Sequence, residues 1–83
     1  MFKGRGPWWA VRDRWDDQWA KRRRADLAHR RWLVSWQRRD DGQWLARVSS
    51  PDLPVTIERA RSTRCRAIEA AVKYLAELTT EGP

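Results

Sequence analysis

The stretch QRRDDGQWLARV, residues 37–48, constrains the fold more than any other, because the register of one hairpin decides which side chains share a face of a sheet. A two-residue turn would place the tryptophans of the two flanking segments on opposite faces. A three-residue turn over 40–42 pairs Trp36 with Ala46 and gathers the tryptophans on one face. Such turns end on a residue in the left-handed region, and Gly42 stands there. We therefore predict the three-residue turn.

Alternation of apolar and polar residues, the pattern of a strand with one buried face, marks three segments. They cover residues 30–39, 43–49 and 55–59. The apolar face of the three strands carries Trp32, Val34, Trp36, Trp44, Ala46, Val48, Val55 and Ile57. Pro51 and Pro54 fall between the second and third strands, where they interrupt no hydrogen-bonded ladder.

Helical periodicity precedes the strands. Trp8, Val11, Trp15 and Trp19 recur at spacings of three and four, which predicts an amphipathic helix with these four residues on its buried side. The pattern continues into residues 21–30 without a Gly or Pro to mark its end.

A second helix is predicted at the end of the chain. Ser62 or Thr63 is a suitable N-cap, and the helix ends by Thr80. Glu69 and Lys73 stand four residues apart and are expected to pair on its outer side. Its buried side is predicted to hold Ile68, Ala71, Val72, Leu75 and Leu78.

These segments predict an α+β fold in the order helix, three-stranded antiparallel sheet, helix (αβββα). Residues 8–83 would form one small domain, and residues 1–7 a flexible basic arm. A chain of 83 residues has room for only a small core, and seven tryptophans supply large side chains for it. A sheet of this kind buries one face beneath helices and leaves the other open.

Positive charge is concentrated in the first half of the sequence. The formal net charge is +7, and residues 1–39 hold 12 basic and 4 acidic side chains against 6 and 7 in residues 40–83. Fifteen of the basic residues are Arg, which contacts phosphate and guanine in forked, bidentate geometry. An uneven excess of this kind is typical of proteins that bind polyanions.

The sequence offers little for catalysis or metal binding. It holds one cysteine, Cys65, and one histidine, His29, which are too few for an intrachain disulfide or a zinc site. Without a phosphate loop or a nucleophile motif, we expect no enzyme activity, no cofactor and no small-molecule substrate. The sequence has no apolar run typical of a signal peptide or a membrane span, so we expect a cytoplasmic protein that does not bind membranes.

The sheet face opposite the tryptophans is the first candidate binding surface. Arg and Gln suit the edges of bases, and Ser and Thr suit bases or phosphates. The polar residues of this face are Arg31, Ser35, Gln37, Arg39, Gln43, Arg47 and Thr56. Leu33 and Leu45 lie among them, which suggests that the face binds something, and a protein interface is one alternative. A small sheet fits the major groove of duplex DNA.

Two basic clusters are candidate phosphate contacts. The first surrounds the start of the last helix and consists of Arg59, Arg61, Arg64 and Arg66. Positive charge there opposes the helix dipole at a cost of about 0.3–1 kcal/mol per charge, so its placement suggests that this helix end holds a phosphate. The second cluster, expected to add nonspecific attraction, is Lys21, Arg22, Arg23 and Arg24.

The segments RRDDGQWLARV and RSTRCRAIEAAVKYLAEL resemble the N-terminal arm-binding domain of tyrosine recombinases. The matching residues are Asp41, Gly42, Trp44, Thr63 and Ala67. The resemblance covers residues 31–78 and implies a three-stranded sheet plus helix that lays its sheet in the DNA major groove.

Two other families share features with the chain. The last helix resembles that of double-stranded-RNA-binding domains, with matches at Ser62, Arg64, Ala70, Ala71 and Leu75. The stretch DDGQWLARVSSPDLP resembles HicB-type antitoxins, with matches at Asp52, Leu53 and Pro54. The first resemblance implies RNA as a ligand, and the second implies a protein partner.

The hypothesis from the sequence is a small, non-enzymatic nucleic-acid-binding protein that prefers duplex DNA, suited to an accessory factor of a phage or mobile element. The alternatives are a protein-binding inhibitor or antitoxin-like module and a double-stranded-RNA binder. A homodimer also fits, with Trp8 or Trp9 serving a second copy.

Overall fold

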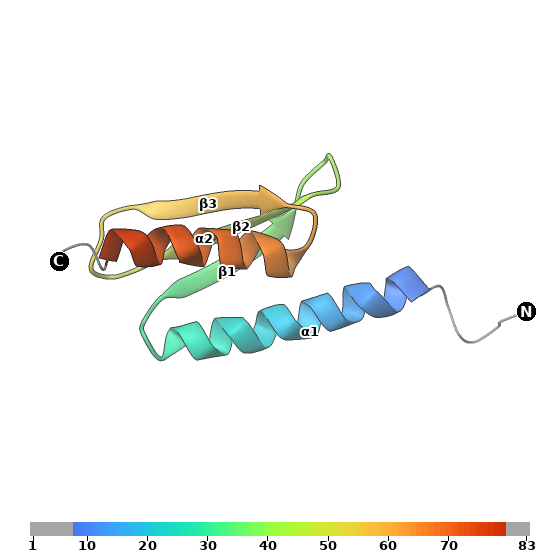
Figure 1. The fold of residues 1–83 in the computed structure, drawn as a ribbon, viewed down its shortest axis with the longest axis horizontal. Helices are drawn as coiled ribbons and strands as arrows, with labels where there is room; N and C mark the ends of the chain where they lie inside the picture. The colour runs from blue at the N-terminus through green and yellow to red at the C-terminus, as the bar shows by residue number, and fades with distance from the viewer. Residues whose placement is uncertain (1–7, 80–83) are drawn as a thin grey trace, which may run out of the picture.

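The computed structural model describes residues 8–79 of the chain, and Figure 1 shows its five elements. The order of the elements confirms the predicted αβββα fold. They are α1 (Trp8–Ala28), β1 (Leu33–Arg38), β2 (Trp44–Ser49), β3 (Thr56–Arg61) and α2 (Arg64–Thr79). The predicted arm over 1–7 and the predicted helix end at Thr80 lie outside the described residues.

The register of the hairpin is the predicted one. The strand order is β1-β2-β3 with antiparallel pairs, and Trp36 lies opposite Ala46. The N–H of Arg39 donates to the carbonyl of Gln43 with an N–O distance of 2.7 Å, which closes a three-residue turn. Gly42 has a φ of +86°, in the left-handed region. The chemistry of one glycine therefore fixes which face of the sheet carries the tryptophans.

Both helices lie on the tryptophan face of the sheet. In Figure 1, α2 lies in front of β2 with β3 running alongside it, while α1 runs beside β1. Trp32 is buried, and Trp36 and Trp44 pack against the core that it joins. The core between the layers is closed by small and branched residues: Ala20, Leu27, Val34, Ala46, Val48, Ile57, Ala67, Ile68, Ala71, Val72 and Leu75.

The third strand begins and ends later than the sequence predicts. Val55 precedes β3 and is exposed, so its predicted place on the buried face is wrong. Ile57 is buried as predicted, opposite Val48. The later end of the strand brings Arg61 into the sheet, opposite Trp44.

Helix α2 packs its predicted stripe against the sheet, except at its last position. Thr63 is the N-cap, because its Oγ1 accepts a hydrogen bond from the N–H of Arg66 at 3.1 Å. Leu78 is exposed, since it lies at the end of α2 beyond the last buried residue of the helix, Leu75. Glu69, expected to pair with Lys73, lies 2.7 Å from Nε of Arg23 on α1 instead.

Helix α1 is rotated from the predicted orientation. Val11 is 46% exposed and Trp15 is 71% exposed, so the prediction that they face the core is wrong. Trp19 packs partly against the core, and the residues that α1 buries there are Ala20 and Leu27. The physical reason is that the buried guanidinium of Arg64 on α2 pairs with aspartates of α1, which must therefore point toward α2.

Helix α1 ends in a Schellman motif built on an arginine. The N–H of Trp32 donates to the carbonyl of Leu27 at 3.1 Å, and the N–H of Arg31 donates to the carbonyl of Ala28 at 2.9 Å. Arg31 has a φ of +65°, where glycine is usual. Trp32 and Leu27 both belong to the buried core, as the hydrophobic contact of this motif requires.

Replacing Arg31 by Gly is expected to stabilise the protein by about 0.5–1 kcal/mol. A left-handed non-glycine residue costs about 1–2 kcal/mol, and the greater unfolded-state freedom of glycine offsets part of that gain. Thermal unfolding should therefore shift upward by a few degrees. Arg30→Gly, one residue earlier, is the matched control and should lower the unfolding temperature. A decrease for both variants would contradict the strain assigned to Arg31.

Candidate nucleic-acid interface

The face of the sheet that points away from both helices is open to solvent, as predicted. We call it the outer face, and it consists of Leu33, Ser35, Gln37, Leu45, Arg47, Ser49, Thr56, Glu58 and Ala60. Leu33 is 73% exposed. Leu45, Ser49 and Ala60 are half-buried, and the other residues of the outer face are exposed.

The outer face carries one cation and one anion, and they are paired. Nε of Arg47 lies 2.6 Å from Oε2 of Glu58 on the neighbouring strand. About half of each side chain is exposed, and pairs of this kind contribute about 0–1 kcal/mol. Arg47 can therefore exchange Glu58 for a partner outside the protein at little cost. The sequence did not reveal this pairing, because it depends on the register of β3.

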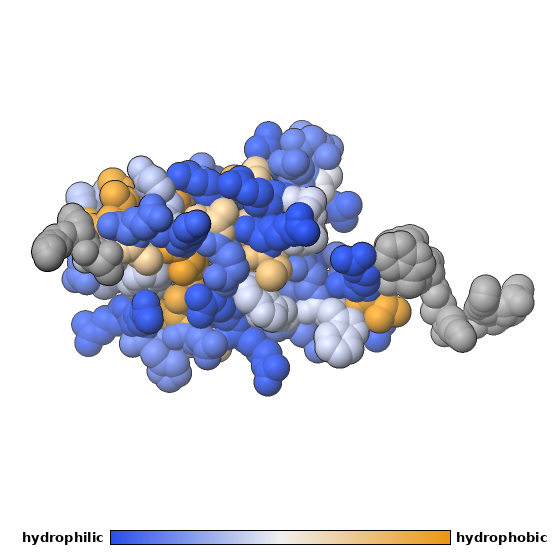
Figure 2. All heavy atoms as spheres, in the orientation of Figure 1, coloured by the Kyte–Doolittle hydropathy of each residue, from blue (hydrophilic) through white to orange (hydrophobic). Residues whose placement is uncertain are grey.

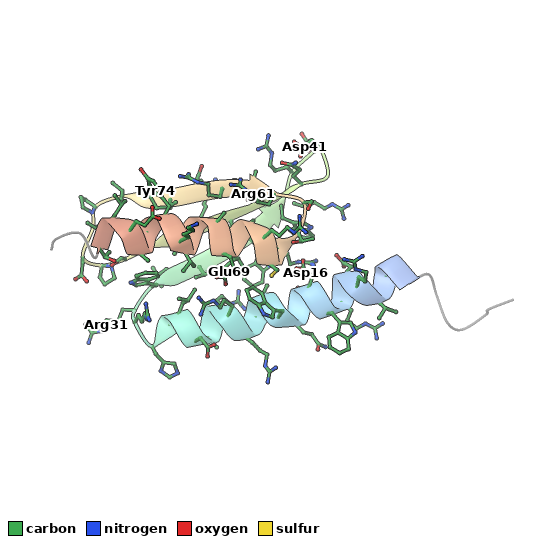
Figure 3. The ribbon with its side chains drawn as sticks, in the orientation of Figure 1. Asp16, Arg31, Asp41, Arg61, Glu69 and Tyr74 are labelled. Carbon is green, nitrogen blue, oxygen red and sulfur yellow. The ribbon has the colours of Figure 1, made fainter. Side chains whose placement is uncertain are left out.

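The tip of the hairpin continues the outer face beyond the strands. Arg39 and Gln43 are exposed there. Nη2 of Arg39 lies 3.5 Å from Oδ2 of Asp41, whose Oδ1 accepts the N–H of Gln43 at 3.0 Å. Figure 3 shows Asp41 at the tip. At the opposite end of the sheet, the turn after α1 presents Arg31 away from the body of the protein (Figure 3).

Arg59 and Arg61 lie on the edge strand β3, on the helix side rather than the outer face. Their Nη1 atoms donate to the main-chain carbonyls of Glu58 and Ala60, both at 2.7 Å. The guanidinium of Arg59 also lies 4.6 Å from the ring centroid of Tyr74 on α2. These two arginines place positive charge along the free edge of the sheet and discourage pairing with another strand.

The start of α2 is occupied by a carboxylate of the chain itself. The N–H groups of Arg64 and Cys65 donate to Oδ2 and Oδ1 of Asp16, at 2.8 and 2.9 Å. Figure 3 shows Asp16 on α1 facing this helix end. The next N–H, of Arg66, is bonded to Thr63. These donors are the ones that would hold an anion, so the phosphate site predicted here is already filled from within.

Arg64 is a buried structural residue, which corrects its predicted role as a phosphate contact. It is 7% exposed. Its Nη1 lies 3.1 Å from both Oδ1 of Asp13 and Oδ2 of Asp16, and its Nε lies 3.6 Å from Oδ1 of Asp17. Its guanidinium lies 3.8 Å from the ring centroid of Trp44. We refer to Arg64 and the three aspartates as the Arg64 cluster.

Arg66 is exposed and belongs to a cleft. The cleft has a volume of about 610 Å³ and lies between α1, the hairpin and the start of α2. Arg12 and Arg38 line it with Arg66, and the carboxylates of Asp13 and Asp16 line it too. The fold thus brings Arg66 together with Arg12 and Arg38, which were not predicted to belong to a site.

The basic run Lys21–Arg24 is not a uniform solvated face. Three of its members have partners within the protein: Lys21 with Asp17 (3.0 Å), Arg23 with Glu69 (2.7 Å) and Arg24 over the ring of Trp36 (4.7 Å). Arg22 is exposed, and within residues 8–79 it forms neither an ion pair nor a cation–π contact. The run therefore serves partly to fasten α1 to the sheet and to α2.

Among residues 8–79, two side chains have displaced pKa values. The pKa of Asp17 is lowered, first by the hydrogen bond from Lys21 and further by the positive charges of Lys21, Arg64 and Arg24, against an opposing desolvation. The pKa of the Cys65 thiol is raised by burial and by the nearby carboxylates of Asp16 and Glu69. Cys65 is thus held as a neutral thiol, whereas a nucleophilic or metal-binding cysteine requires the thiolate.

The aspartates of the Arg64 cluster were not among the residues predicted to have a role. Asp13, Asp16 and Asp17 stand at helical spacing, so one side of α1 gathers three negative charges. That spacing was a usable signal, because a compact acidic group on a helix facing its own domain requires a cation. Its partner could not be identified, since Arg64 is one of many arginines.

No family model matches the chain, and no curated protein or solved structure matches it. Within residues 8–79, no group of three or more His, Cys, Asp or Glu side chains is placed to hold a metal ion. Neither helix in the described part of the chain has the length and apolar character needed to cross a bilayer.

Proposed function

We propose that the protein is a small non-enzymatic binder of duplex DNA that contacts the duplex through the outer face of its sheet. The observation that carries the proposal is the openness of this face, since neither helix covers Ser35, Gln37 or Arg47. A sheet covered on one side and bare on the other offers a rigid surface whose side chains point outward at fixed spacing.

The dimensions of the sheet suit a major groove. Neighbouring strands lie about 4.7–4.9 Å apart, so three strands span roughly 10 Å. The major groove of B-DNA is about 12 Å wide and admits β-structure. The outer face therefore fits the groove, with the helices on the side away from the duplex.

The chemistry of the outer face suits base edges. Gln37 can form a bidentate contact with an adenine. Arg47 can form a bidentate contact with a guanine once its ion pair with Glu58 is broken. Leu33, which is 73% exposed, would contact the methyl group of a thymine. Ser35 and Thr56 supply short hydroxyl contacts.

Phosphate contacts would come from around the outer face, because the face itself is neutral. The candidates are Arg31, Arg39, Gln43, Arg59, Arg61 and Arg66, with Arg22 adding long-range attraction and Arg64 left out. The net charge of +7 draws the protein to a polyanion, while the outer face supplies discrimination. The single cysteine fits a reducing, cytoplasmic setting, which forms part of the proposal.

A protein partner is the second candidate function. Leu33 at 73% exposed and the half-buried Leu45 give the outer face an apolar component that base recognition uses only in part. Under this alternative, the protein shows little affinity for nucleic acid at physiological salt. The proposed accessory role in a phage or mobile element belongs to the DNA-binding alternative.

The test is a titration of fluorescently labelled duplex DNA at several salt concentrations, with wild type and Glu58→Gln. If the five candidate arginines all contact phosphates, the logarithm of the affinity should fall with a slope of about −4.5 against the logarithm of the salt concentration. Removing the carboxylate of Glu58 frees Arg47 and deletes a repulsive charge, so the affinity should rise about fivefold. An affinity independent of salt, or one unchanged by Glu58→Gln, would count against duplex binding by the outer face.

A further inference from the structure

The solvent face of α1 is unusual because it combines an exposed indole with positive charge. Trp15 is 71% exposed and Val11 is 46% exposed. Figure 2 shows pale and apolar side chains over the N-terminal half of α1, among hydrophilic neighbours. A large aromatic side chain left uncovered on a small protein is a candidate contact surface.

The charges of α1 are sorted between its two sides. Asp13, Asp16 and Asp17 belong to the Arg64 cluster. Arg14 and Arg22 are exposed, and they flank Trp15 at spacings of one and seven residues. The Arg64 cluster therefore holds three of the four aspartates of α1 toward α2, and a strip of cations and indoles remains toward solvent, with Asp26 as its acidic member.

Two adjacent hollows lie along this strip. The first has a volume of about 470 Å³ and is lined by Trp15, Gln18, Trp19, Lys21 and Arg22. The second, of about 410 Å³, is lined by Trp19, Arg22, Arg23, Ala25 and Asp26. They share Trp19 and Arg22, so the same indole and the same guanidinium border both hollows.

We propose that this strip of α1 binds single-stranded nucleic acid, with unpaired bases stacked on Trp15 and Trp19 and phosphates held by Arg14 and Arg22. Single-strand binders combine aromatic platforms with cations that follow the backbone. The indole of Trp15 offers a free face for stacking, which a base within an intact duplex cannot use. The carboxylate of Asp26 adds an acceptor for an exocyclic amino group in the second hollow.

Charge and composition disfavour the other occupants of this strip. A second copy of the chain would bring two strips of net positive charge together, which is unfavourable. An anionic membrane would need a broad apolar stripe, whereas the described solvent face of α1 offers few large apolar side chains beyond Val11 and Trp15. A polyanion with aromatic bases satisfies both the charge and the indoles.

This inference rests on residues separate from the outer face, although it extends the proposed function. The duplex would lie against the sheet and the unpaired strand against α1. The protein would then suit a junction between paired and unpaired nucleic acid. If duplex binding by the outer face is not observed, single-strand binding by α1 can still be measured, and the reverse also holds.

The experiment is fluorescence anisotropy with a labelled oligothymidylate, which forms no duplex, at low salt. Trp15→Leu should weaken binding about tenfold, because the apolar volume is kept while the stacking face is lost. Trp15→Phe should retain most of the affinity. Since Trp15 is largely exposed, all three proteins should unfold at the same temperature and bind duplex DNA equally. Tyr74→Leu on α2 is the matched aromatic control and should not change single-strand affinity.

Three results would overturn the inference. The first is no binding of the oligothymidylate by wild type at low salt. The second is equal affinity of Trp15→Leu and wild type for it. The third is binding of phosphatidylglycerol vesicles that Trp15→Leu preserves while the oligothymidylate is ignored. Loss of duplex binding alone would contradict the proposed function of the sheet and leave this inference standing.

Discussion

Replacing Asp16 by Ala is expected to lower the free energy of unfolding by about 3–5 kcal/mol. Asp16 is almost buried, with 12% of its side chain exposed, and it contacts the guanidinium of Arg64 at 3.1 Å. It also accepts the N–H groups of Arg64 and Cys65. The substitution leaves a buried cation with fewer partners and removes the carboxylate that receives the first two donors of α2.

The loss is large for a protein of this size, since small domains unfold at a cost of about 5–15 kcal/mol. Urea denaturation followed by circular dichroism measures it directly. Asp26→Ala is the matched control, because Asp26 is exposed on the same helix and the substitution has the same effect on helix propensity. The control should change stability by less than about 0.5 kcal/mol. Equal effects of the two variants would show that the Arg64 cluster does not hold α1 against α2.

The sheet and α2 could be predicted from the sequence because their signals are local. The turn at 40–42 depends on one residue able to adopt a positive φ, and Gly42 has it. Thr63 caps α2, and the apolar residues predicted from Ile68 to Leu75 are all buried in the core. The register set by this turn then decides which side chains of the paired strands share a face.

The rotation of α1 could not be predicted from its own sequence. A stripe of Val11, Trp15 and Trp19 is the more apolar side, and hydrophobic periodicity alone would bury it. In the fold, the side that carries Asp16 and Ala20 is buried instead. The need of the buried Arg64 for carboxylate partners outweighs the hydrophobic gain from burying the indoles of α1.

The end of α1 was undetermined for a different reason. Schellman motifs usually place glycine in the left-handed position, and the sequence has none near residue 31. Arg31 takes that conformation because the flanking Trp32 and Leu27 are both buried in the core. Tertiary packing overrides the local preference of the backbone there.

The sequence predicts those site residues whose position follows from the alternation of side chains along a strand. It does not predict residues whose position depends on contacts with a distant segment. Ser35, Gln37 and Arg47 lie on the outer face as expected. Arg59 and Arg61 lie on the helix side because they alternate with Ile57, and Arg61 joins the sheet because β3 ends later than predicted. The burial of Arg64 follows from contacts with a helix about fifty residues earlier in the chain, which no local pattern encodes.

Gln37→Glu is expected to lower the affinity for duplex DNA about tenfold or more. A bidentate contact from glutamine to adenine is worth about 1–3 kcal/mol, and the carboxylate abolishes its donor half. The new negative charge also stands on the surface that faces the polyanion. The change is isosteric and exposed, so the stability of the fold should be close to that of wild type.

Comparing Gln37→Glu with Gln18→Glu tests most directly whether the outer face binds the duplex. The two variants carry the same chemical change and the same net charge, one on the sheet and one on the solvent face of α1. Duplex affinities measured side by side at one salt concentration should show a large loss for Gln37→Glu, with Gln18→Glu close to wild type. A loss confined to Gln18→Glu, or equal small effects of both, would contradict a duplex seated on the sheet.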